Sequence, residues 1–149
     1  MSNVTQQLLA ILREGVEGPG DGGAYFLDSG PDAGLRRTLA TLTAEEASRP
    51  WGGNSVAAHA HHALFSFEAF AARIAGDRTS RDWDESWRVK EVDDAQWAKL
   101  QQDLVRGYEA LHRAIEANGG EAIGTALAAT THLAYHIGAI RQKIAAARA

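Results

Sequence analysis

The sequence contains no cysteine, which excludes disulfide bonds, thiolate metal ligands and a cysteine nucleophile. No segment approaches the roughly 20 consecutive apolar residues that a membrane-spanning helix needs. The first residues, MSNVTQQLLAILREG, lack the basic leader and small-residue cleavage site of a secretory signal. We therefore expect no membrane partner, no need for an oxidising compartment, and a cytoplasmic location by default.

Clusters of positive charge are also missing. The chain has 15 lysines and arginines against 19 acidic residues, which gives a formal net charge of −4. Because nucleic-acid-binding proteins usually present a basic face, we expect no nucleic-acid partner. The 149 residues fit a single domain, 1–149, that is long enough to bury a core.

Proline is scarce, and long stretches carry apolar residues at helical spacing. Glycine-rich residues 15–23 and polar residues 77–91 are predicted to be loops, the second lying over the helices. Short connections between long amphipathic helices favour an all-α fold, an antiparallel four-helix bundle with short extra helical segments. We expect a first helix that ends before Gly15, a second from about Asp32 to Leu42, and a short helical turn opened by a capping box at Thr43 and Glu46. Three long helices should follow. They run from Asn54 or Ser55 to about Ala75, from about Asp93 to Ala117, and from Gly120 or Glu121 almost to the C-terminus.

The candidate metal ligands in this sequence are histidines. His132 and His136 are four residues apart, so both imidazoles lie on one helix face, one turn apart. Two such nitrogens can reach one ion at about 2.0–2.1 Å each. The segment between them lacks the glutamate that a metalloprotease uses as general base, which argues against that chemistry.

A second cluster, on the helix after Ser55, can supply a third ligand. His59 and His62 each precede an apolar core position, as His132 and His136 do, so all four flank their apolar stripes on the same side. His61 points about 200° away from His59, at 100° per residue, and is expected to face solvent. The alternative is that these histidines are ordinary structural residues, since a pair at this spacing also arises by chance.

Two segments resemble the DinB-like superfamily: residues 55–62, SVAAHAHH, and residues 131–138, THLAYHIG. The resemblance extends from about Leu35 to Gln142. It implies a four-helix bundle, often a homodimer, in which three histidines bind zinc, nickel or a related divalent ion. The family's first ligand lies seven positions after the hydroxyl residue that opens the helix, which is His62 here, and the other two match His132 and His136. His59 stands where the family has an apolar residue, so it is either a neighbour of the site or an alternative ligand.

The resemblance also implies that the metal activates a low-molecular-weight thiol in some relatives, while others are implicated in isomerase chemistry. A three-histidine site leaves an open coordination position, so we expect a metal-dependent enzyme that acts on a small molecule, by thiol S-transfer or by hydrolysis through a metal-activated nucleophile. A metal-binding protein without turnover and a plain helical dimerisation module stay open as alternatives. No general acid or base is evident: Glu68 is expected to be a solvated helix residue and Tyr135 a packing residue. The tryptophans at positions 51, 83, 87 and 97 either line a pocket mouth or cover the end of the bundle, and Arg141 is expected on the surface.

Overall fold

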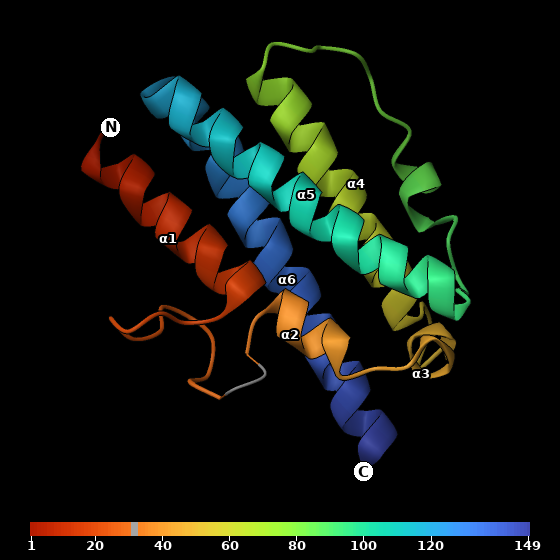
Figure 1. The fold of residues 1–149 in the computed structure, drawn as a ribbon. Helices are drawn as coiled ribbons and strands as arrows, with labels where there is room; N and C mark the ends of the chain where they lie inside the picture. Colours follow the sequence, from red (N-terminus) through yellow and green to blue (C-terminus); the bar gives the residue numbers. More distant parts are fainter. Residues whose placement is uncertain (31–32) are drawn as a thin grey trace.

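The computed structural model describes residues 1–30 and 33–149 as helices joined by loops (Figure 1). This part of the chain contains no β-strand, which confirms the predicted all-α class. The elements, in chain order, are α1 (Asn3–Glu17), α2 (Leu35–Ala40), α3 (Ala44–Ser48), α4 (Val56–Ile74), the 3₁₀ helix η1 (Trp83–Trp87), α5 (Asp94–Asn118), the 3₁₀ helix η2 (Gly119–Ala122) and α6 (Ile123–Arg148).

Helices α1, α3, α4 and α5 each begin at a side chain that accepts a hydrogen bond from a free backbone amide. Thr43 and Glu46 form the predicted capping box at the start of α3. Of the two caps considered for α4, Ser55 is the one used: its hydroxyl accepts a hydrogen bond from the Ala58 N–H and donates one to the Lys90 carbonyl. Ser55 therefore also ties the segment before α5 to the beginning of α4.

Two expectations for the helices need correction, and a third cannot be compared with the structure. The first helix continues to Glu17, two residues past the predicted break at Gly15, because its residues there remain buried against the core. Residues 77–91 are not all loop, since they contain η1, which packs on α4. The start predicted for the second helix, Asp32, lies outside the described residues, and α2 begins at Leu35.

The four longer helices share one apolar core. Helix α4 packs against α5 and α6, and α1 packs against α5 and α6 (Figure 1). Each long helix contributes side chains that solvent barely reaches: Leu12, Phe67, Leu111 and Ile137 are each at most 2% exposed. Removing such a side chain typically costs about 2–5 kcal/mol, so this core holds α4 and α6 in their relative position.

A buried carboxylate organises the connection between α1 and α2. Glu14, 3% exposed, accepts hydrogen bonds from the backbone N–H groups of Tyr25, Phe26 and Leu27 at 2.6–2.8 Å. Burial acts to raise the pKa of Glu14, but these three donors together outweigh it and lower the pKa. The loop is thus fastened to α1 through an ionised side chain.

None of the described helices is long and apolar enough to cross a membrane.

Candidate metal centre

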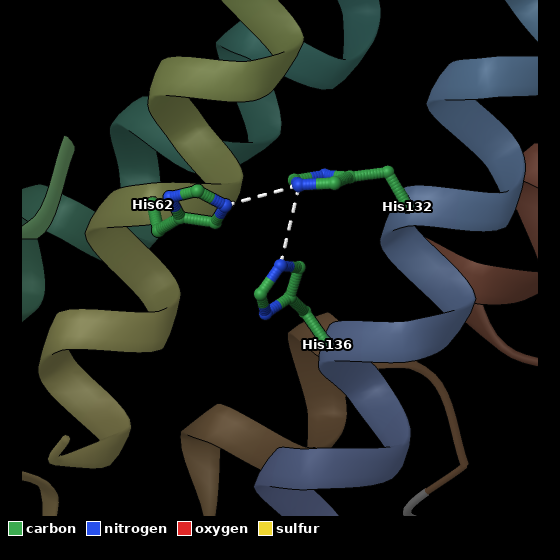
Figure 2. A group of neighbouring side chains, drawn as sticks. All are labelled: His62, His132 and His136. Carbon is green, nitrogen blue, oxygen red and sulfur yellow. Dashed lines mark hydrogen bonds between the residues drawn. The ribbon is translucent and has the colours of Figure 1, made fainter. Parts of the chain in front are cut away.

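Helices α4 and α6 bring His62, His132 and His136 together, and their imidazoles point toward one another (Figure 2). The Nε2 atom of His132 lies 3.0 Å from Nε2 of His62 and 3.2 Å from Nε2 of His136. One ligand nitrogen from each residue lies within 4.8 Å of the others. The fold therefore brings His62 next to His132 and His136, which lie 70 and 74 residues further along the chain.

The spacing of these nitrogens suits a tetrahedral ion. Two nitrogens that each lie 2.0–2.1 Å from a tetrahedral centre are about 3.3 Å apart. The observed separations of 3.0 and 3.2 Å differ from that value by only a few tenths of an ångström. The ligand nitrogens of His62 and His136 lie within 4.8 Å of each other, so the three histidines can supply three of the four ligands of such an ion.

The three imidazoles are in the chemical form that binds metals. Burial, followed by the effect of neighbouring histidines, lowers the pKa of His62 to about 4 and that of His136 to about 3. Burial also lowers the pKa of His132. At neutral pH these side chains are uncharged, and a neutral imidazole offers a nitrogen lone pair to an ion.

His59 is a neighbour of the cluster. It is 8% exposed, and its Nδ1 lies 3.1 Å from Nδ1 of His136, on the side of that ring away from His132. His59 is therefore a neighbour of the group of three and contacts it through His136.

The prediction that His61 faces solvent is wrong. Its side chain is half-buried, and its Nδ1–H donates to the Ser86 carbonyl at 2.7 Å. The next residue, His62, contacts the Ser86 hydroxyl through Nδ1 at 2.6 Å. One residue of η1 thus contacts two consecutive histidines of α4, and helical periodicity alone gives no indication of such a contact.

Aromatic rings surround the cluster. Trp87 stacks on His62 with ring centroids 4.1 Å apart, and Trp83 contacts both His62 and His132. Phe70 of α4 lies edge-on to His132, with ring centroids 6.0 Å apart. Two of the four tryptophans therefore lie at the site.

The other two tryptophans serve elsewhere. Trp97 is buried and donates its indole N–H to the Leu42 carbonyl, whereas Trp51 lies under the Arg49 guanidinium. Ser86 and Phe70 were not among the site residues expected from the sequence. Ser86 lies in a polar segment that showed no periodicity, so no signal identified it.

Side chains considered for other roles lie outside the cluster. Tyr135 is 73% exposed, so the expected packing role is wrong, although its ring edge meets His136. Glu68 is exposed as expected, and Arg141 donates to Asp28 on the surface. A cavity of about 820 Å³ lies between α4, α5 and the preceding segment; His61 and Glu68 line it, but none of the three clustered histidines does.

Scans against protein families, curated proteins and solved structures found no match to this chain. What the site can do therefore follows from its own donors. Three neutral imidazoles suit zinc, nickel, cobalt and iron, so the donor set alone does not select one metal.

Proposed function

We propose that the chain binds one divalent transition metal, zinc or nickel, on His62, His132 and His136. The observation that carries the proposal is the convergence of one nitrogen from each of these three buried, neutral side chains. Imidazoles crowded in this way lose solvation, and an ion compensates that loss by accepting their lone pairs.

The proposal includes membership of the DinB-like superfamily, an antiparallel four-helix bundle and a homodimer. The resemblance of residues 55–62 and 131–138 supports the family, and the shared core of α1, α4, α5 and α6 supports the bundle. Leu127 and Tyr135 on α6 are 52% and 73% exposed, and they supply apolar surface for a second copy to cover.

We further propose a metal-dependent enzyme that acts on a small molecule by thiol S-transfer or hydrolysis. A divalent ion with three protein ligands and an open position acts as a Lewis acid and lowers the pKa of a bound water or thiol. This open position favours catalysis over the alternative of metal binding without turnover, because structural sites usually carry four protein ligands.

The test is the metal content of untagged protein purified without chelators, compared with the His132→Ala/His136→Ala double variant. His112→Ala is the matched control, since this histidine of α5 pairs with Glu116 outside the cluster. We expect close to one transition-metal ion per chain in the wild type and the control, and none in the double variant.

Two further variants test the choice of ligands. His62→Ala should abolish stoichiometric binding, whereas His59→Ala should weaken it without abolishing it. Metal loss in His59→Ala with retention in His62→Ala would show that the first ligand is misassigned. No binding in the wild type, even after reconstitution with zinc or nickel, would refute the proposal and leave a helical protein with structural histidines.

A further inference from the structure

Two of the three clustered histidines have a hydrogen-bond partner on their outward-facing nitrogen. His62 Nδ1 lies 2.6 Å from Ser86 Oγ, and His136 Nδ1 lies 3.1 Å from His59 Nδ1. A neutral imidazole carries one N–H and one bare nitrogen, so each of these contacts decides which nitrogen carries the proton. The partners therefore determine what the ligands present to an ion.

The proton positions can be followed outward from η1. The Ser86 hydroxyl lies 2.5 Å from the Trp83 carbonyl oxygen, which can only accept a hydrogen bond. A hydroxyl has a single proton, so Ser86 Oγ must accept from His62 Nδ1–H. The neutral His62 ring then has no proton on Nε2, and its lone pair points into the cluster.

The proton on His62 Nδ1 determines the proton positions of the two histidines of α6. His132 Nε2 lies 3.0 Å from the bare His62 Nε2, so it must be the donor in the metal-free protein. An N–H nitrogen of an imidazole has no lone pair to accept with, so His136 Nε2, 3.2 Å from His132 Nε2, must also be bare. The His136 proton is consequently on Nδ1, where it is donated to His59 Nδ1.

We propose that Ser86 and His59 are positioning residues that hold His62 and His136 with bare ε-nitrogens, and that His132 alone changes tautomer when a metal binds. This inference rests on the proposed metal binding. The proton on His132 Nε2 leaves to solvent, and His132 Nδ1 takes one up, so the net proton count is unchanged. His132 is half-buried, and no Nδ1 hydrogen bond is seen for it within the described part of the chain, which leaves that nitrogen to solvent.

The arrangement differs from the common one in which a carboxylate supports a metal-bound histidine. His59 is an uncharged acceptor, so it fixes the His136 ring without adding negative charge to the site. An ion held there keeps more of its own positive charge, which favours Lewis-acid chemistry.

Nitrogen NMR of ¹⁵N-labelled protein reports the tautomers directly. In the metal-free wild type we expect His62 and His136 protonated at Nδ1, and His132 protonated at Nε2. Addition of Zn²⁺ should move only the His132 proton, to Nδ1. Calorimetric titration of Zn²⁺ at pH 7.5, in two buffers of different ionisation enthalpy, should show no net proton release by the protein.

Variants separate positioning from packing. Ser86→Ala and His59→Leu remove the two acceptors, and each should weaken Zn²⁺ binding by roughly 10–100-fold, the usual effect of losing such a partner. His59→Gln keeps an oxygen acceptor for His136 and should bind within about threefold of the wild type. His112→Ala is again the control, and circular dichroism of each metal-free variant verifies that it is folded.

The outcomes distinguish this inference from the proposal on which it depends. If the folded Ser86→Ala and His59→Leu variants bind Zn²⁺ with wild-type affinity, the positioning roles are wrong, although the proposed metal binding still holds. A metal-free His62 or His136 protonated at Nε2, or an unchanged His132 tautomer in zinc-bound protein, would overturn the proton arrangement. No zinc-dependent change in the wild type would overturn metal binding and the His132 switch together.

Discussion

Glu14→Gln tests how strongly the loop before α2 depends on one buried carboxylate. One carboxylate oxygen accepts from Tyr25 N–H, and the other accepts from the N–H groups of Phe26 and Leu27. A glutamine that keeps the second oxygen turns its NH₂ group toward Tyr25 N–H, so two donors face each other. The substitution therefore removes the hydrogen bond from Tyr25 N–H, and the other two N–H groups donate to a neutral amide oxygen instead of a charged carboxylate.

The magnitude follows from these contacts. A hydrogen bond to a charged group contributes about 1.5–3 kcal/mol and a neutral one about 0.5–1.5 kcal/mol, so one lost bond and two weakened ones sum to roughly 3.5–6 kcal/mol in a rigid loop. The loop is mostly exposed, and water can partly replace the lost acceptor. We therefore expect Glu14→Gln to lower the free energy of unfolding by about 2–4 kcal/mol.

Urea denaturation followed by circular dichroism measures this change. Glu17→Gln is the matched control, because Glu17 lies on the same helix but pairs with Arg36 at the surface. That ion pair is worth under about 1 kcal/mol. Equal midpoints for the two variants would refute the structural role assigned to Glu14.

The same residue predicts a pH dependence. The pKa of Glu14 is lowered in the folded protein, so the unfolded chain binds the proton more readily. The stabilisation is therefore complete above the unfolded pKa, about 4.5, and is lost as the pH falls below it. The stability difference between the wild type and Glu14→Gln should shrink between pH 6 and pH 3; a constant difference would contradict the assigned charge.

Two other changes have clear expected results. Gly34→Ala should lower the free energy of unfolding by more than about 2 kcal/mol in the urea assay, because Gly34 has φ +94° and an added Cβ would lie 2.4 Å from Gly18 N. Gly22→Ala is the control, since no described atom beyond its chain neighbours lies within 4 Å of its added Cβ. Equal urea midpoints for the two variants would contradict the close approach of Gly34 to Gly18. Trp87→Phe should remove much of the Ni²⁺-dependent quenching of tryptophan fluorescence, since Trp87 stacks on a proposed ligand, whereas Trp51→Phe should not; the reverse result would place the ion elsewhere.

Local signals in the sequence located most helices. Capping residues such as Thr43 interact with amides only a few residues away, so their effect can be read without knowing the fold. The same holds for His132 and His136, whose common face is a property of one helix. Choosing His62 over His59 needed the family resemblance, because spacing alone left both available.

Contacts between distant segments were decided only by the tertiary structure. Ser86 reaches His62 across 24 residues, and His59 reaches His136 across 77. From helical periodicity we expected His61 to face solvent and Tyr135 to pack against other residues. Both expectations were wrong, because periodicity does not show which segment covers each face of a helix.

The sequence by itself determined the helical class, the caps and the set of histidines available as ligands, because these depend on interactions within one or two turns. The tertiary structure decided which nitrogen of each histidine faces the other two, and which residue contacts the outward-facing nitrogen of His62 and of His136. That outcome depends on how α4, α6 and η1 pack together, and packing sums many weak contacts between residues far apart in the chain.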